Sequence, residues 1–312
     1  MIKPKELKPN STIGIISPSY WLDEKVLKQT SKHFTDLGYK IILGSSNFLR
    51  NGPFAGTPQD RAKDIHEMFK NPKVDAIICA RGGYGANKVL PLLDYDLIKN
   101  NPKIFLGYSD ITAFLLSISQ KTELITFHGP MLSSFKENFI DYNYHHMLKV
   151  LQLKNERKIF SSRTSPFKVL KSGIGRGRIW GGNMTLLINR LGTPNALSTE
   201  NIILFLEDVD EYLYSFERNL IHMYESEMFK NTKGLIIGDL YNFKDQSVPF
   251  NKNTDEIVLD ICDKLDIPII SDFPCGHGKY QCTIPMSVLV ELNVTTNKPY
   301  IEILEDAVQQ ND

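Results

Sequence analysis

The stretch "VDAIICARGGYGANKVLPLLDYDLIKNNPKIFLGYSDITAFLLSIS", residues 74–119, contains the same pattern twice. An apolar run rich in β-branched residues ends at a corner of small or polar residues, and a run with helical spacing follows. The corners are "RGGYG" (81–85) and "GYSD" (107–110). Strands that alternate with helices predict right-handed crossovers and a parallel sheet with helices on both faces.

The pattern continues on both sides of this stretch. Further strands are predicted at 11–20, 40–46 and 124–132, and further helices at 23–39 and 61–72. Ligands of such sheets collect beyond the carboxyl ends of the strands. The polar corners at these ends are therefore expected to surround one cleft, and they are "SPS" (17–19), "RGGYG" (81–85), "GYSD" (107–110) and "HGPM" (128–131).

The second half of the chain has a different character. Residues 153–172 lose the periodicity and gain charged, Ser and Thr residues, as a linker would. We expect an N-terminal α/β domain at 1–152 and a strand-rich C-terminal α/β domain at 173–312. Strands of the second domain are predicted at 201–210, 234–241, 267–278, 286–294 and 300–306, and helices at 181–192, 215–228 and 254–265.

Composition narrows the class of protein. The 312 residues suggest two domains, and 42% hydrophobic with 23% charged residues is typical of globular chains. The 36 basic and 36 acidic residues cancel, which argues against a nucleic-acid or anionic-membrane partner. No apolar run has the roughly 18–20 residues that span a bilayer. Four scattered cysteines form no disulfide framework, and a cytoplasmic enzyme with a small-molecule or peptide substrate is favoured.

Ser109 stands at the second corner. A strand-to-helix corner can present a serine hydroxyl as a nucleophile, with backbone N–H groups close by. The G-x-S-x-G signature is absent, because position 111 is Ile. The alternative is that Ser109 or Asp110 caps the following helix.

The glycines of the first corner allow three interpretations. Gly82, Gly83 and Gly85 could let the backbone approach a bound nucleotide, but the G-x-G-x-x-G spacing is not met. Their N–H groups could instead form an oxyanion hole that faces Ser109. A plain tight turn is the third interpretation.

Two of the seven histidines are candidates for a general base, because each stands beside a glycine at the end of an apolar strand. They are His128 and His277. The segment around His277 also offers Cys275 and Cys282 as metal ligands. The paired C-x-x-C spacing of a zinc site is missing, which makes a metal centre the weaker interpretation.

A carboxylate that orients the histidine would complete a catalytic set. The strand "ILFLEDVDEY" ends in acidic residues. Because a carboxylate at the end of a buried strand is unfavourable unless it is paired, Glu207 and Asp208 are better candidates than the acids that follow. A solvated acidic turn is the alternative.

Five motifs together resemble the LD-carboxypeptidase family of serine peptidases. They are "RGGYG" (81–85), "GYSDIT" (107–112), "GGN" (181–183), "LEDVDE" with "ER" (206–218) and "GHG" (276–278). The resemblance implies Ser109 as the nucleophile, Glu207 as the orienting carboxylate and His277 as the general base.

The resemblance also implies the surroundings of these residues. The backbone N–H of Asp110 and that of Gly82 or Gly83 would form the oxyanion hole. Apart from the resemblance, Arg81 and Tyr108 are candidates for substrate binding: a substrate carboxylate needs a cation, which Arg81 could supply, and a purely structural arginine is the alternative. The implied fold is an N-terminal flavodoxin-like doubly wound sheet and a C-terminal β-barrel-like domain with the cleft between them. The family is commonly homodimeric and needs no metal or organic cofactor.

The leading hypothesis is therefore a cytoplasmic enzyme of cell-wall recycling that removes the terminal D-alanine from murein tetrapeptides. One alternative is the activity of the microcin-inactivating branch of the family, which hydrolyses aminoacyl or peptidyl nucleotide amides. A non-catalytic nucleotide- or sugar-binding module is the alternative from another class.

Overall fold

The structure is a computed structural model that describes residues 1–136, 141–153, 158–159, 167–295 and 299–310. The chain forms two compact units. Unit 1 consists of Met1–Asn155, Cys282–Ser287 and Asp306–Asp312, and unit 2 consists of Glu156–Gln281 and Val288–Glu305. The domain limits at residues 152 and 173 stay a prediction.

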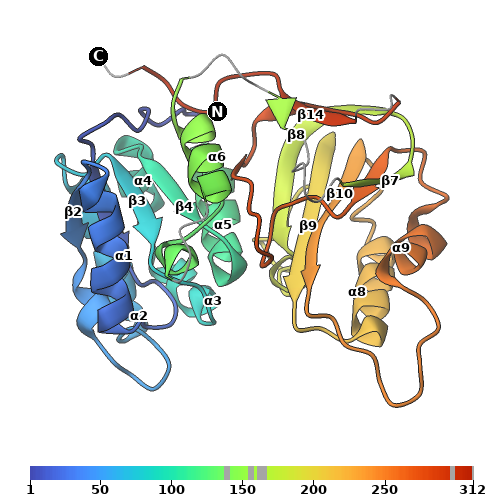
Figure 1. The fold of residues 1–312 in the computed structure, drawn as a ribbon, viewed down its shortest axis with the longest axis horizontal. Coiled ribbons are helices and arrows are strands. Elements are labelled where there is room, and N and C mark those ends of the chain that lie inside the picture. Colours follow the sequence, from blue (N-terminus) through green and yellow to red (C-terminus); the bar gives the residue numbers. More distant parts are fainter. Residues whose placement is uncertain (137–140, 154–157, 160–166, 296–298, 311–312) are drawn as a thin grey trace. The chain divides into compact units, whose positions relative to one another are not determined.

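Unit 1 is built on a sheet of six described strands in the order β12-β5-β4-β3-β1-β2. Figure 1 labels β2, β3 and β4 of this sheet. Its described strands are β1 (Thr12–Ile16), β2 (Lys40–Leu43), β3 (Ala76–Cys79), β4 (Ile104–Gly107), β5 (Phe127–His128) and β12 (Ile284–Pro285). Strands β1 to β5 pair in parallel, and β12 is antiparallel to β5. Strands β1, β3 and β4 are fully buried, which explains their continuous apolar sequences.

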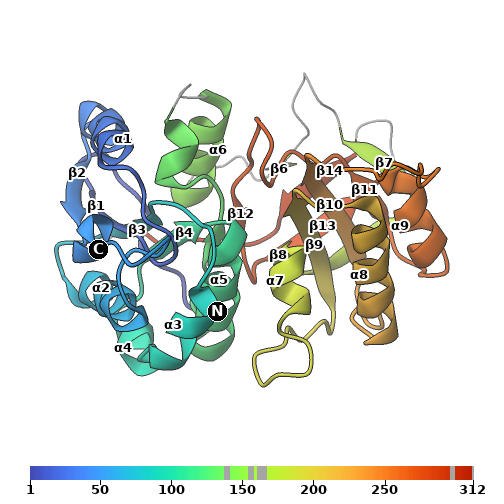
Figure 2. The ribbon, with the colours of Figure 1, turned by 90° about the horizontal axis from the view of Figure 1, so that it is seen from below.

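Helices cover both faces of this sheet. The α-helices are α1 (Glu24–Asp36), α2 (Pro58–Lys70), α3 (Ala86–Val89), α4 (Tyr95–Asn100), α5 (Thr112–Thr122) and α6 (Asp141–Leu151). The 3₁₀ turns are η1 (Ser45–Phe48), η2 (Leu90–Leu92), η3 (Ser109–Ile111) and η4 (Leu132–Phe135). Helices α1 and α6 lie on one face, and α2, α4 and α5 lie on the other (Figure 2). Helix α2 begins before the expected residue 61, because Thr57 and Asp60 form a capping box around Pro58.

Unit 2 contains a curled sheet of eight described strands in the order β6-β14-β13-β8-β9-β10-β11-β7 (Figure 1). They are β6 (Lys158–Ile159), β7 (Lys168–Lys171), β8 (Ile174–Asn183), β9 (Ile202–Val209), β10 (Gly234–Tyr241), β11 (Ile269–Ser271), β13 (Leu289–Asn293) and β14 (Tyr300–Ile303). Strands β8 to β11 are parallel, and the flanking strands pair antiparallel. The helices of this unit are α7 (Met184–Ile188), α8 (Leu213–Glu225) and α9 (Thr254–Cys262). The predicted fold class, a flavodoxin-like sheet with a strand-rich β-barrel-like second part, is confirmed.

Strand β8 differs from the sequence-based expectation, which started a helix at residue 181. The "GGN" motif instead ends a ten-residue strand. Glycines make this strand possible, because a Cβ on Gly175, Gly177 or Gly181 would lie within 1.8–2.5 Å of a carbonyl oxygen. The same glycines make this strand difficult to predict from the sequence, since glycine has a low propensity for β-strands.

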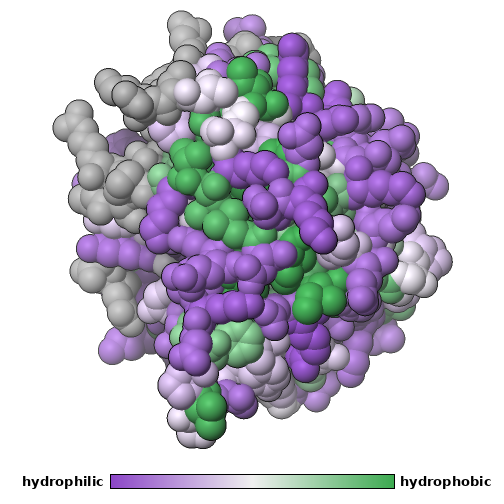
Figure 3. Space-filling view, turned by 90° about the vertical axis from the view of Figure 1, so that its right-hand side faces the viewer, coloured by the Kyte–Doolittle hydropathy of each residue, from purple (hydrophilic) through white to green (hydrophobic). Residues whose placement is uncertain are grey.

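The surface of unit 2 mixes polar and apolar side chains. Figure 3 shows a face of this unit on which polar side chains surround a band of apolar ones. Exposed apolar residues of the unit include Val169, Ile174, Ile221 and Val248. Apolar atoms are a normal part of protein surfaces. Among the described residues, no helix combines the length and the apolar character needed to cross a bilayer.

Candidate active site

The corner at Ser109 has an unusual backbone. Strand β4 ends at Gly107. Ser109 has a backbone φ of 63°, which lies in the left-handed region that residues other than glycine rarely adopt. Neither η3 nor α5 begins with a side-chain cap, so the interpretation of Ser109 or Asp110 as a helix cap is wrong. Such backbone outliers often occur at functional sites, where surrounding contacts hold them in place.

The glycine loop lies directly against this corner. A Cβ on Gly82 would be 3.0 Å from Ser109 Cβ, 3.2 Å from Ser109 Oγ and 3.4 Å from the amide nitrogen of Asp110. Gly83, with a φ of 126°, packs instead on the ring of Tyr20. Of the two glycines predicted for an oxyanion hole, Gly82 is therefore the one in contact with Ser109. A side chain at this position would crowd the hydroxyl.

Arg81 and Tyr108 flank the same corner. The Arg81 guanidinium lies 5.6 Å from the ring centroid of Tyr20 and donates a long hydrogen bond, 3.5 Å, to Trp21 O. Among the residues that the structure describes, Arg81 forms no ion pair with a carboxylate within 4.0 Å. Tyr108 is half-buried, and its ring centroid lies 6.1 Å from that of the buried His128.

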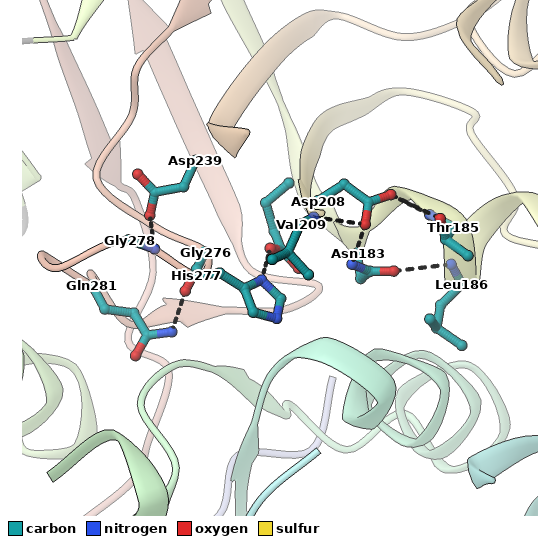
Figure 4. Close-up of polar contacts among 11 residues, drawn as sticks. Asn183, Thr185, Leu186, Asp208, Val209, Asp239, Gly276, His277, Gly278 and Gln281 are labelled. Atoms are coloured by element: carbon teal, nitrogen blue, oxygen red, sulfur yellow. Dashed lines mark hydrogen bonds and ion pairs between the residues drawn. The ribbon is translucent and has the colours of Figure 1, made fainter. Parts of the chain in front are cut away.

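Unit 2 brings Glu207 and His277 together. His277, labelled in Figure 4, has its Nδ1 2.7 Å from Glu207 Oε2. The Glu207 side chain is fully buried, and that of His277 is 16% exposed. Glu207 stands near the end of β9, and His277 follows Gly276 in the loop after β11. Gly276 has a φ of 144°, and a Cβ there would lie 3.1 Å from Glu207 Oε2. The glycine therefore allows the loop to approach the carboxylate.

Charges around His277 change its pKa in opposite directions. Burial lowers the pKa of His277, whereas the charge and the hydrogen bond of Glu207 raise it, and Asp208 and Asp239 add to the increase. The net effect is a pKa above the ordinary histidine value. Because Nδ1 is held by Glu207, Nε2 is the nitrogen that could take a proton from a nucleophile.

Asp208, the other acid considered from the sequence, serves a different purpose. Its carboxylate accepts hydrogen bonds from Asn183 Nδ2 at 2.9 Å, from the backbone of Thr185 at 3.0 Å and from Thr185 Oγ1 at 2.9 Å (Figure 4). These bonds tie the start of α7 to β9. Burial, followed by the charge of Glu207, raises the pKa of Asp208 to about 6. Glu207, and not Asp208, therefore contacts the histidine.

Asp239 was not singled out from the sequence. It lies in β10, and its Oδ2 accepts a hydrogen bond of 3.0 Å from the backbone N–H of Gly278 (Figure 4). Burial is the main reason why the pKa of Asp239 is raised to about 6. The only signal in the sequence is an acid inside an apolar strand, "GLIIGDLY". The contact fixes the residue next to His277.

The metal interpretation gains no support from the described residues. No group of three or more His, Cys, Asp or Glu side chains in the described part of the chain is arranged to hold a metal ion. Cys282 belongs to unit 1, where its Sγ lies 3.0 Å from the hydroxyl of Tyr142. Cys275 is buried in unit 2.

Two family models cover most of the chain. The N-terminal domain of LD-carboxypeptidases matches residues 13–129, and the C-terminal domain of LD-carboxypeptidases matches residues 176–292. The chain belongs to the LD-carboxypeptidase family. This confirms the resemblance drawn from the five motifs.

Individual relatives of this family match nearly the whole chain. A probable murein peptide carboxypeptidase of Bacillus subtilis is 32% identical over 303 residues, which are 96% of this chain and 94% of the relative. The microcin C7 self-immunity protein MccF of Escherichia coli is 30% identical over 302 residues, 85% of this chain and 86% of the relative. Both branches of the LD-carboxypeptidase family are thus close to this chain.

Solved structures of the family have the same fold. The structure of MccF in complex with glutamyl sulfamoyl guanosine superposes with a TM-score of 0.90 at 25% identity, covering 99% of this chain and 100% of that chain. A muramoyltetrapeptide carboxypeptidase from Oxalobacter formigenes gives a TM-score of 0.84 at 26% identity, covering 97% and 100%. This family is a family of serine carboxypeptidases, which makes the chain a hydrolase of that general class.

Proposed function

We propose that this protein is a serine-type LD-carboxypeptidase that releases the terminal D-alanine from murein tetrapeptides during cell-wall recycling. The observation that carries the proposal is the pairing of His277 Nδ1 with the fully buried Glu207 carboxylate at 2.7 Å. A histidine held in this way is prepared to act as a general base for a serine. The 32% identity to a murein peptide carboxypeptidase supports the substrate class.

In the proposed reaction, Ser109 Oγ attacks the carbonyl carbon between the L-configured centre of the diamino acid and D-alanine. His277 Nε2 accepts the hydroxyl proton, and Glu207 stabilises the resulting imidazolium without taking the proton itself. The negative oxygen of the tetrahedral intermediate accepts hydrogen bonds from the N–H groups of Asp110 and Gly82. The contact of Gly82 with Ser109 supports this choice over Gly83.

The intermediate collapses when the amide C–N bond breaks and the imidazolium gives its proton to the leaving nitrogen of D-alanine. Water then attacks the acyl-Ser109 ester, with His277 as base again, and the tripeptide leaves with a new carboxylate. Every proton transfer in this sequence uses the same ring nitrogen. No step needs a metal or an organic cofactor.

Arg81 is proposed to bind the free carboxylate of the terminal D-alanine, with Tyr108 beside it. The guanidinium stands next to Gly82 in the sequence and has no carboxylate partner among the described residues, which supports this role. A requirement for a terminal carboxylate would make the enzyme an exopeptidase. Amidation of the substrate's C-terminus tests this role, since it should abolish cleavage.

The direct test of the proposed function is the release of D-alanine from a murein tetrapeptide. Ser109→Ala should abolish release while the melting temperature changes by less than about 2 °C. Ser247→Ala, which alters an exposed serine in a loop of unit 2, serves as the matched control and should keep full activity. An active Ser109→Ala variant would remove Ser109 as the nucleophile.

A second candidate function is the hydrolysis of aminoacyl or peptidyl nucleotide amides. The 30% identity to MccF and the TM-score of 0.90 to its structure favour it. The same nucleophile, base and acid would serve both reactions. Comparing kcat/KM for a murein tetrapeptide with that for an aminoacyl sulfamoyl nucleoside decides between the two substrates.

A non-catalytic binding module is the remaining alternative. Covalent labelling of Ser109 by a serine-reactive phosphonate would argue against it, whereas tight nucleotide binding without hydrolysis would support it.

The proposal also includes a cytoplasmic location, a homodimer and a division of the chain at residues 153–172. Analytical ultracentrifugation tests the dimer, and fractionation of the producing cells tests the location.

A further inference from the structure

The side chain of Asp110 is buried beside the nucleophile, although the proposed mechanism uses only its backbone N–H. It is 2% exposed. Its Oδ2 accepts a short hydrogen bond from Ser19 Oγ and another, 3.0 Å long, from the backbone N–H of Ala86. One carboxylate thus joins the residue after Ser109 to two other loops at the carboxyl edge of the sheet.

Arg61 connects the same two loops from the side of α2. Its side chain is 1% exposed, and Nη1 donates to Pro18 O at 3.0 Å and to Gly85 O at 3.3 Å. The guanidinium also lies 5.2 Å from the ring centroid of Phe54. Burial raises the pKa of Asp110, and the charge of Arg61 opposes this increase by favouring the ionised carboxylate. A buried charge is unfavourable unless it is hydrogen-bonded, and these contacts supply the bonds.

We infer that the Asp110 side chain and Arg61 are positioning residues, which hold the glycine loop and the amide of residue 110 around Ser109. The inference rests on the proposed function. Because the network binds the C-terminal end of the glycine loop, at Gly85 and Ala86, it holds the two proposed oxyanion donors at one separation. It also maintains the left-handed backbone of Ser109.

A carboxylate suits this task better than an amide. Two donors, Ser19 Oγ and the backbone N–H of Ala86, converge on one oxygen of Asp110, Oδ2. A charged carboxylate oxygen accepts stronger hydrogen bonds than an amide oxygen and complements the charge of Arg61, whereas an asparagine at this position is neutral. The loop would then move away from Ser109. Oxyanion donors act over a narrow range of distances, so a small displacement lowers the rate of the chemical step more than it changes substrate binding.

The test compares Asp110→Asn with Asp64→Asn. Asp64 is a matched control: it is 1% exposed, lies on the same helix as Arg61, and accepts hydrogen bonds from Ser45 and Ser46 at a different loop of unit 1. Active sites are titrated with a fluorophosphonate. The kcat for D-alanine release is then expressed per titrated site, together with KM, the rate of phosphonylation and the melting temperature.

We expect Asp110→Asn to lower the kcat per site by about 10²-fold, with KM changed by less than about threefold and phosphonylation slowed in parallel. Asp64→Asn should lower the melting temperature and keep the kcat per site. If Asp110→Asn reduces only the titrated fraction, or if both variants lose the same kcat per site, the role is structural and the inference is wrong.

A milder variant covers the case in which Asp110→Asn does not fold. Ser19→Ala removes one donor to the carboxylate and should slow both turnover and phosphonylation per site by about 5–10-fold. Wild-type rates in this variant would overturn the inference. Failure of the proposed function is distinguishable, because the wild-type protein would then neither release D-alanine nor react with the phosphonate.

Discussion

Replacing Glu207 by Gln removes the charge that orients and stabilises His277 while it preserves the shape of the side chain. The wild-type hydrogen bond is 2.7 Å long and joins a fully buried carboxylate to a ring nitrogen. A hydrogen bond to a charged group contributes about 1.5–3 kcal/mol, which corresponds to about 10–150-fold in rate if it acts only on the imidazolium. The carboxamide of the Glu207→Gln variant can also donate a hydrogen bond to Nδ1 of His277, which favours the tautomer with the proton on Nε2. In this tautomer Nε2 cannot accept the proton of Ser109, so the expected loss of kcat extends to about 10⁴-fold.

The pH profile gives a second readout of Glu207→Gln. His277 must be neutral to act as a base, and the Glu207 charge raises its pKa, so activity increases with pH through a value above that of an ordinary histidine. Without the carboxylate, the acid limb of kcat/KM should move to lower pH. The assay is the release of D-alanine from a tetrapeptide between pH 5 and 9, with Glu225→Gln on the exposed side of α8 as the control. An unchanged acid limb together with near wild-type kcat would refute the role of Glu207.

Three further outcomes follow from the geometry. Gly82→Ala should lower kcat by about 10²-fold or more, because the added Cβ would lie 3.2 Å from Ser109 Oγ. The control is Gly192→Ala, where no heavy atom would lie within 4 Å of the added Cβ, and this variant should keep the wild-type kcat. Gly181→Ala should destabilise unit 2 by more than about 3 kcal/mol in urea unfolding, since its Cβ would lie 1.8 Å from a carbonyl oxygen of β9; a stable variant would contradict the close strand approach. The pKa of Asp239 is raised to about 6, so the folded protein binds the proton more tightly and the free energy of unfolding falls as pH rises from about 4 to about 6. Asp239→Asn should therefore be more stable than wild type above pH 6 by about 1–3 kcal/mol, and thermal melts in which this difference does not shrink toward pH 4 would oppose the assignment.

Local patterns were sufficient to predict the parallel sheet of unit 1. Continuous apolar runs such as those of β3 and β4 indicate strands that are buried on both faces, and the corners after them mark the edge where ligands bind. The exact start of α2 depended on a capping box around Pro58, which the apolar periodicity alone does not show. Strand β8 was missed because its glycines are required by close contacts with the backbone of Asn201, Phe205 and Lys233, and these contacts join residues far apart in the sequence.

The candidate site was predictable where each residue stands at the end of an apolar run. Ser109, Glu207 and His277 all satisfy this condition, and the order of five motifs connected them to one family. The roles of the Asp110 side chain and of Arg61 were not predictable. Their partners, Ser19 and the backbone of residues 85 and 86, are more than twenty residues away along the chain, and buried polar contacts of this kind leave no periodic signal.

The short strand β12 has a consequence for the synthesis of the protein. The segment Cys282–Ser287 belongs to unit 1, although the chain on both sides of it belongs to unit 2. During translation, residues 129–283 must therefore be made after β5 before the edge of this strand gains its partner, β12. An unpaired edge strand is a template for association with other chains, so the nascent protein carries this risk until β12 has been made. A fragment that ends before β12 would retain it permanently.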